Sequence, residues 1–309
     1  MREKMRLVTR SDFDGLACAM MLKEMDLIDD IKFVHPKDVQ DGKVELNEYD
    51  ITTNLPYDPR VSIAFDHHES EVDRLKATET GGKLIIDPHA RSAARVVYNY
   101  YGGKSRFPGI SEELMEAVDK GDSADFTMDE ILNPKGWVLL HFLMDPRTGL
   151  GRFHDFRVSN YDLMMELIDY CREHTIDQIL ELPDVKERVD LYFQQADLFQ
   201  QQLKRIAKVY DKVVVLDLRG EEVIHAGNRF MIYALYPETE ISIHVAWGFK
   251  KQNTAVMIGK SIVNRASKAD IGELCLKYGG GGHANAGTCQ LDNDTVDKQL
   301  PDIIAALNP

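Results

Sequence analysis

A short apolar run at residues 61–65 ends directly in Asp66, His67 and His68. Brief runs rich in β-branched residues are typical of buried strands. Because open α/β sheets bind their ligands beyond the carboxyl ends of the strands, this pattern predicts a carboxylate and two imidazoles at such a site. Adjacent histidines at a strand end have few uses in core packing, so we interpret them as a metal or catalytic site rather than as a solvated polar turn.

A second acidic cluster follows the first predicted strand, at residues 7–9. Asp12 and Asp14 lie between that strand and an apolar helical run at residues 16–23. Two carboxylates on a strand-to-helix loop suit hard divalent cations such as Mg²⁺ or Mn²⁺. Asp12 could instead cap the helix, which would explain one aspartate but not both.

The order of the predicted elements indicates the fold class. Strands are expected at residues 31–34, 49–53, 61–65 and 83–86, and helices at residues 16–26 and 91–101. This alternation predicts an α/β chain whose N-terminal domain, at residues 1–182, is a doubly wound, mostly parallel sheet. Helices are expected within residues 127–182 as well, and we assign no chemistry to them.

The C-terminal part of the chain has a different pattern of predicted elements. A long helical pattern predicts a connecting helix at residues 183–210. Strands are then expected at residues 213–218, 241–247 and 254–258, with helices at residues 228–236 and 270–277. We therefore expect a second, smaller α/β domain at residues 211–309.

A glycine run in the second domain predicts an anion site. Gly280, Gly281 and Gly282 directly precede His283. Glycine amides can form an anion-binding nest, and the histidine would lie beside it. A flexible turn is the alternative, but a histidine followed by small residues is unusual for a linker.

Two other polar segments admit a structural and a functional interpretation. Ser92, with Arg91 beside it, starts a predicted helix and would suit a phosphate group, although ordinary capping explains it equally well. Asp119 and Asp122 follow an apolar helical run and would suit a metal ion, although a solvated turn explains them equally well.

Charge and cysteine content restrict the partners of the chain. The 309 residues include 51 acidic and 37 basic side chains, and the formal net charge is -14. Such a chain repels long polyanions, which argues against binding of long duplex DNA, whereas a small anionic substrate held by metal is compatible. Four scattered cysteines predict a reduced, cytoplasmic protein, and no apolar run approaches the roughly 20 residues that span a bilayer.

Four motifs, taken in this order, resemble the DHH phosphoesterase superfamily with its C-terminal DHH-associated domain. They are residues 12–15 (Asp-Phe-Asp-Gly), 66–68 (Asp-His-His), 119–122 (Asp-Lys-Gly-Asp) and 280–283 (Gly-Gly-Gly-His). Within the superfamily the chain is most similar to the oligoribonuclease, phosphoadenosine phosphatase and exopolyphosphatase-related group.

The resemblance implies a metal-dependent hydrolase of phosphoester or phosphoanhydride bonds. The implied substrate is a small nucleotide, a short oligonucleotide or polyphosphate, and the implied cofactor is Mn²⁺ or Mg²⁺, one or two ions per chain. It also implies binding of nucleic acid in the form of short substrates, and it is compatible with a homodimer.

Site residues are carried over by position. The metal ligands would be Asp12, Asp14, His67 and an aspartate of the third of these motifs, for which Asp119 is preferred to Asp122. Asp66 and His68 would orient ligands or contact the phosphate. The substrate-binding residues implied in this way are Gly280, Gly281, Gly282 and His283, with Arg91, Lys260 and Arg265 as weaker candidates.

Two positions depart from the family pattern. Arg10 stands where the family commonly has a histidine, and Asn54 stands where it usually has an aspartate that bridges both metals. Arginine cannot ligate a cation, and asparagine offers only a neutral oxygen. One metal position is therefore weakened, and Arg10 would replace its cation as a fixed positive charge. The alternative function is a catalytically weakened nucleotide-binding or regulatory protein with an altered metal site.

Overall fold

The computed structural model describes residues 4–68, 83–153 and 155–308 and divides the chain into two units. The first unit consists of Met1–Asp125, Lys135–Pro146 and Phe153–Val189. The second consists of Phe126–Pro134, Arg147–Arg152 and Asp190–Pro309. It therefore includes two short segments that precede its main part in the sequence.

The first unit contains a five-stranded parallel sheet in the order β2-β1-β3-β4-β5. Its strands are β1 (Met5–Thr9), β2 (Ile28–Phe33), β3 (Asp50–Thr53), β4 (Ile63–Asp66) and β5 (Lys83–Ile86). The order reverses between β2-β1 on one side and β3-β4-β5 on the other. Ligands of doubly wound sheets bind at such a switch point, beyond the carboxyl ends of the strands.

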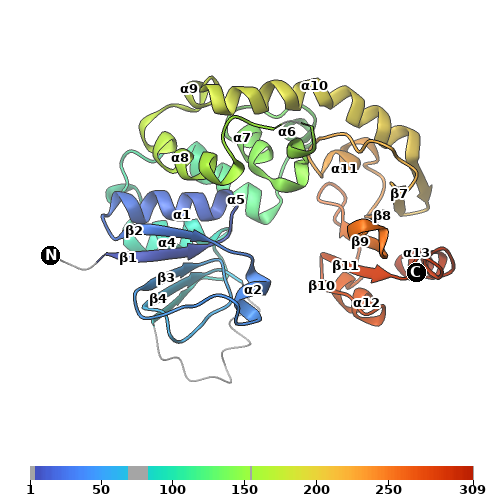
Figure 1. Cartoon of the computed structure of the whole chain (residues 1–309), viewed down its shortest axis with the longest axis horizontal. Helices are drawn as coiled ribbons and strands as arrows, with labels where there is room; N and C mark the ends of the chain where they lie inside the picture. The colour runs from blue at the N-terminus through green and yellow to red at the C-terminus, as the bar shows by residue number, and fades with distance from the viewer. Residues whose placement is uncertain (1–3, 69–82, 154, 309) are drawn as a thin grey trace. The chain divides into compact units, whose positions relative to one another are not determined.

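Helices of the first unit pack on this sheet and on one another (Figure 1). They are α1 (Phe13–Glu24), α2 (Pro36–Gln40), α4 (Ala93–Tyr101), α5 (Glu112–Ser123), α7 (Gly136–Met144), α8 (Asn160–Glu173) and α9 (Ile176–Leu180). Residues 13–22 of α1 are all buried. A helix that is apolar all round lies inside a core, and α1 contacts α4, α5 and α8. Residues that start α4 and end α5 thereby come close to the first turn of α1.

The second unit contains a six-stranded mixed sheet in the order β10-β11-β9-β8-β7-β6. Its strands are β6 (Ala207–Tyr210), β7 (Val213–Asp217), β8 (Ile241–Trp247), β9 (Thr254–Lys260), β10 (Gly281–His283) and β11 (Ala286–Leu291). Only β7 and β8 pair in parallel among the neighbours of this sheet. Its helices include α6 (Met128–Leu132), α11 (Met231–Leu235), α12 (Ile271–Lys277) and α13 (Val296–Leu307).

Alternate residues of the sheet in the second unit pack against α12 and α13. Ile241, Ile243 and Val245 of β8 share a buried core with Ile271 of α12 and Ile303 of α13. Because successive side chains of a strand point to opposite faces, the residues between them face the other side of the sheet. The two faces of β8 therefore have different surroundings.

These observations confirm the predicted fold class, a parallel α/β sheet followed by a second α/β unit. The predicted helix at residues 183–210 is α10 (Pro183–Ile206), and the prediction is wrong for residues 207–210. Those residues form β6, which pairs antiparallel with β7 between Ala207 and Leu216. Sheet pairing at this edge overrides the local helical pattern. Within the part of the chain that the structure describes, no helix is both long enough and apolar enough to cross a membrane.

Arg188 of α10 is the largest fully buried side chain described in the first unit. Its guanidinium lies 3.9 Å from the centroid of the Phe156 ring. It donates hydrogen bonds to the carbonyl oxygens of Asp184 (2.7 Å) and Val158 (2.9 Å) and to Oδ1 of Asn160 (3.0 Å). This side chain therefore ties the start of α10 to the segment that precedes α8.

We predict that R188A lowers the free energy of unfolding by about 3–5 kcal/mol, because it leaves a cavity in place of a fully buried side chain and removes the donor of three hydrogen bonds. Urea denaturation of the full chain measures this change. The control is R172A, which removes an exposed arginine paired with Asp169 and is expected to change the free energy by less than about 1 kcal/mol. Equal effects of the two substitutions would contradict the structural role of Arg188.

Candidate metal centre

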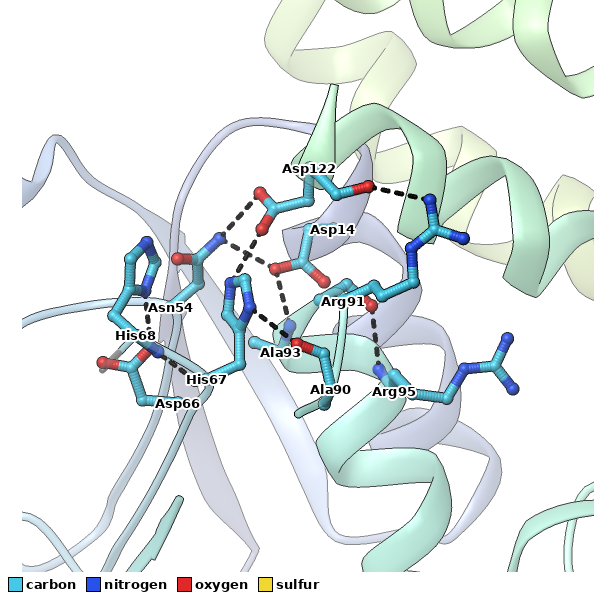
Figure 2. A network of polar contacts seen from close by, with 12 residues as sticks. Asp14, Asn54, Asp66, His67, His68, Ala90, Arg91, Ala93, Arg95 and Asp122 are labelled. Carbon is cyan, nitrogen blue, oxygen red and sulfur yellow. Dashed lines mark hydrogen bonds and ion pairs between the residues drawn. The ribbon is translucent and has the colours of Figure 1, made fainter. Parts of the chain in front are cut away.

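Four polar side chains of the first unit point toward one another at the switch point of its sheet (Figure 2). Asp14 lies in the first turn of α1, which follows β1, and Asn54 directly follows β3. His67 directly follows β4, and Asp122 lies in the last turn of α5. Segments that are far apart in the sequence therefore meet where a doubly wound sheet binds its ligand.

Short distances join these side chains. Nε2 of His67 lies 2.7 Å from Oδ2 of Asp122. Nδ2 of Asn54 donates to Oδ2 of Asp14 at 2.8 Å and to Oδ1 of Asp122 at 3.5 Å. Asp14, His67 and Asp122 each offer one ligand atom, and these atoms all lie within 4.8 Å of one another. This is the spacing of groups that share one cation.

The N-terminus of α4 holds the Asp14 carboxylate. Its oxygens accept hydrogen bonds from the backbone N–H groups of Ala93 (3.2 Å) and Ala94 (2.7 Å). The first N–H groups of a helix have no partner within it, and the positive end of the helix dipole favours a carboxylate there. Burial nevertheless raises the pKa of Asp14 well above its usual value, and the charges of Asp122 and Asp12 raise it further.

A backbone carbonyl sets the orientation of the His67 ring. Nδ1 of His67 donates to the carbonyl oxygen of Ala90 at 3.2 Å, so Nε2 faces Asp122. Metal-binding histidines are commonly held in this way by a hydrogen bond at the other ring nitrogen. Burial lowers the pKa of His67, but the hydrogen bond and charge of Asp122, with smaller effects of Asp14 and Asp66, raise it to about 9.

The arrangement fits a divalent cation. Two carboxylates and an imidazole are ligands that Mn²⁺ and Mg²⁺ accept. In the structure, Nε2 of His67 and the side-chain amide of Asn54 face these carboxylates. Oδ1 of Asn54 is buried and receives no hydrogen bond from the described residues. That oxygen is a neutral ligand atom next to the group, in keeping with the weakened second metal position predicted from the sequence.

The geometry favours Asp122 over Asp119, which the sequence had favoured, as the candidate ligand. Oδ1 of Asp119 accepts from Oγ of Ser92 at 2.7 Å, and Oδ2 accepts from Nε (2.9 Å) and Nη2 (2.7 Å) of Arg95. Both oxygens are therefore engaged in joining α5 to α4. Asp122, one helical turn later, faces Asp14 and His67 instead. Asp119 thus has structural partners, and Asp122 as a ligand is a prediction that this geometry supports.

Asp12 and Arg10 form a pair beside the metal group. Oδ1 of Asp12 accepts from the backbone N–H of Gly15 at 3.0 Å and so caps α1, the alternative that the sequence left open. Oδ2 of Asp12 lies 3.0 Å from Nε of Arg10. Asp12 is not part of the group formed by Asp14, His67 and Asp122. Burial raises the pKa of Asp122, but the hydrogen bond and charge of His67, and then the charge of Arg10, lower it below its usual value. Arg10 therefore favours the ionised form of Asp122.

Asp66 holds the turn that carries both histidines. Its Oδ1 accepts from the backbone N–H groups of His67 (2.7 Å) and His68 (3.2 Å) and lies 2.8 Å from Nδ1 of His68. Asp66 is buried, whereas the side chain of His68 is 46% exposed. The ligand atoms of these three residues also lie within 4.8 Å of one another. An orienting role for Asp66 and a substrate contact by His68 remain predictions compatible with this geometry.

Arg91 and Ser92 have structural partners. Nη2 of Arg91 donates to Oγ of Ser123 at 3.2 Å and pairs with Asp125. Oγ of Ser92 accepts from the backbone N–H of Arg95 at 3.0 Å, so Ser92 caps α4. A phosphate contact by Arg91 stays a prediction, and it would require the exchange of these partners.

The glycine run does not form the predicted nest over residues 281–283. Those residues are β10, paired with β11 between Gly282 and Gly287. In an extended strand, successive N–H groups point to opposite sides, whereas a nest needs them on one side. A Cβ at Gly280 would lie 2.2 Å from the carbonyl oxygen of Thr288, so close packing explains that glycine. The roles of Gly281 and His283 in binding substrate remain predictions.

The other two substrate-binding candidates also lie in the second unit. Lys260 ends β9, and the exposed Arg265 donates from Nε to the carbonyl oxygen of Ile262 at 3.1 Å. Their roles remain predictions. Sequence reasoning missed the backbone groups of Ala90, Ala93 and Ala94, because amides and carbonyls leave no signature in residue type. From the sequence, Ser92 and Arg95 could be recognised only as part of a helix start, and their contacts with Asp119 could not be foreseen.

Family models give no match to this chain, and curated proteins give none either. Among solved structures, the chain is similar to the pGpG-specific phosphodiesterase PggH from Vibrio cholerae, with 57% identity over 99% of each chain and a TM-score of 0.87. It also resembles CDC45 from Entamoeba histolytica, with 8% identity, 100% of this chain and 96% of that chain covered, and a TM-score of 0.52. The second similarity concerns the fold alone.

We predict that D122N lowers the affinity for Mn²⁺ by about 100-fold or more. Loss of a residue that only orients a metal ligand already lowers metal affinity by about 10–100-fold, and loss of a ligand should lower it further. Equilibrium dialysis measures this affinity. D119N is the matched control: it should change the affinity by less than about tenfold and should lower the free energy of unfolding by about 1–3 kcal/mol, because Arg95 loses its charged partner at Asp119 and keeps only Glu112. The opposite pattern, with Mn²⁺ lost only in D119N, would restore Asp119 as the ligand.

Proposed function

The chain belongs to the DHH phosphoesterase superfamily, and we propose that it hydrolyses the linear guanine dinucleotide pGpG at its phosphodiester bond. It is a phosphoesterase that acts on small nucleotides. The observation that carries the finer proposal is the 57% identity to a pGpG-specific phosphodiesterase over 99% of both chains. Hydrolysis of this bond by water would give two molecules of GMP.

We propose Asp14, His67 and Asp122 as the residues that hold the catalytic Mn²⁺ or Mg²⁺. A divalent ion there would supply a Lewis acid that neutralises phosphoryl charge and lowers the pKa of bound water. The chain itself contributes rigidity: the α4 amides fix Asp14, and the Ala90 carbonyl fixes the His67 ring. Fixed groups of this kind need little reorganisation during the reaction.

Arg10 is the candidate for offsetting phosphate charge. Its guanidinium pairs with Asp12 at the edge of the metal group, and its charge affects Asp122. Because Asn54 replaces the expected bridging aspartate, the group has one anionic ligand fewer than the family pattern. The fixed positive charge of Arg10 would then neutralise part of the phosphate charge that a second metal ion would otherwise neutralise.

We predict that the purified chain converts pGpG to GMP with Mn²⁺ and that D14A lowers kcat/KM by about 1000-fold or more, because the group loses a carboxylate fixed by two amides. Chromatography of the products measures the rate. The control is D30N, which removes an exposed carboxylate on β2 and should leave the rate unchanged. Binding of pGpG without any product would favour the alternative, a nucleotide-binding protein with an altered metal site.

We predict that the chain binds one Mn²⁺ tightly, because Asn54 supplies no charge to a second position. Titration followed by electron paramagnetic resonance counts the bound ions. The double substitution R10H/N54D restores both residue types of the family pattern and should raise the count to two. Two tightly bound ions in the unmodified chain would rule out the substitution of a metal by Arg10.

A further inference from the structure

A single histidine interrupts the apolar helix α7 of the first unit. Residues 137–144 of this helix are all buried, and His141 is the one titratable side chain among them. It is 7% exposed. An apolar side chain would fill such a position without burying the polar atoms of an imidazole ring. The position of His141 next to the metal group gives this ring a use.

The ring of His141 packs against the residues that precede both carboxylates of the metal group. Its centroid lies 5.9 Å from that of the Phe13 ring, and the two ring planes are inclined at 60°. Phe13 directly precedes Asp14 in α1, and Gly121 directly precedes Asp122 in α5. A Cβ built on Gly121 would lie 2.5 Å from Cε1 and 2.6 Å from Nδ1 of His141. One imidazole ring therefore contacts both segments.

This contact explains the glycine at position 121. Gly121 lies inside α5 and is not among the described glycines with positive φ. Glycine is less favourable than alanine inside a helix, so the helix alone gives no reason for it. The His141 ring occupies the place that a Cβ would take, and the missing side chain allows α5 and α7 to approach each other. The distance between these helices therefore depends on the size of the ring.

Other buried aromatic rings confine His141. Phe13 also packs against Trp137 of α7, with 6.4 Å between the ring centroids, and both side chains are buried. The ring of Phe142 lies 5.6 Å from that of His141, again between centroids. Protein interiors are close-packed and contain few voids, so they transmit displacements. A change of size at His141 would therefore move Phe13, Gly121 or both.

We propose that His141 is a positioning residue that sets the separation of Asp14 and Asp122. This inference rests on the proposed function, in which both aspartates bind the metal ion. The ligand atoms of the group lie within 4.8 Å of one another, and a divalent ion accepts oxygen ligands only over a narrow range of distances. His141 belongs to neither group of candidate ligands and acts through Phe13 and Gly121.

A double-mutant cycle of G121A and H141A in the full chain tests this role. G121A adds a methyl group against the ring, and H141A removes the ring. Each should lower the affinity for Mn²⁺ by about tenfold or more, the loss typical of a residue that orients a metal ligand. In G121A/H141A the methyl group enters the space that the ring leaves. The affinity should then be at least about fivefold above that of either single variant.

Equilibrium dialysis measures the affinities, and urea denaturation of the metal-free variants shows whether each is folded. The matched control is L140A, which creates a cavity at a fully buried position of the same helix. It should lower the midpoint of unfolding and change the affinity by less than about twofold. This comparison separates a general loss of stability from a change in the metal group.

Two results in folded variants would overturn the proposal: losses of affinity that simply add in the double variant, or a loss in L140A as large as that in H141A. G121A removes no side chain, so an unaltered affinity in this variant would also overturn it, even where H141A does not fold. The failure of the proposed metal group is distinguishable. Affinity that D122N leaves unaltered would refute that group, whereas affinity lost in D122N but kept in H141A would refute this inference alone.

Discussion

The buried carboxylates of Asp14 and Asp122 are the constraint on which the first unit depends. Two like charges this close and this buried are unfavourable unless a positive charge or proton lies between them. In the structure the His67 ring and the Asn54 amide face these carboxylates. A divalent cation held by the same carboxylates and by Nε2 of His67 would require Nε2 to carry no proton, because metal binding and deprotonation of a ligand are linked.

The elements around the group keep it in place. The helix α4 presents its free N–H groups to Asp14 and its Ser92 and Arg95 side chains to Asp119. One helix thus fixes a site residue directly and also anchors α5, which carries Asp122. Removal of the Asp119 interaction would disturb the site only through the position of α5. Two aspartates three residues apart in α5 therefore have different surroundings.

Much of the fold and part of the site followed from residue pattern. Short β-branched runs located the parallel strands, and the polar residues that follow them, Asp14, Asn54 and His67, were placed at the correct edge of the sheet. The motif favoured Asp119 over Asp122, whereas Asp122 is the one that faces the cluster. Both lie in the same helix, so only tertiary packing decides between them. Asp12 caps α1, the alternative that the sequence left open, and its role as a ligand stays a prediction.

The most direct test of the account is a crystal structure of the full chain soaked in Mn²⁺, with anomalous scattering used to locate the ion. We expect an ion bound directly by Asp14, Nε2 of His67 and Asp122, with Nδ1 of His67 still bonded to Ala90 and Asp119 still paired with Arg95. An ion bound by Asp119, or an intact pair between His67 and Asp122 at saturating Mn²⁺, would contradict it.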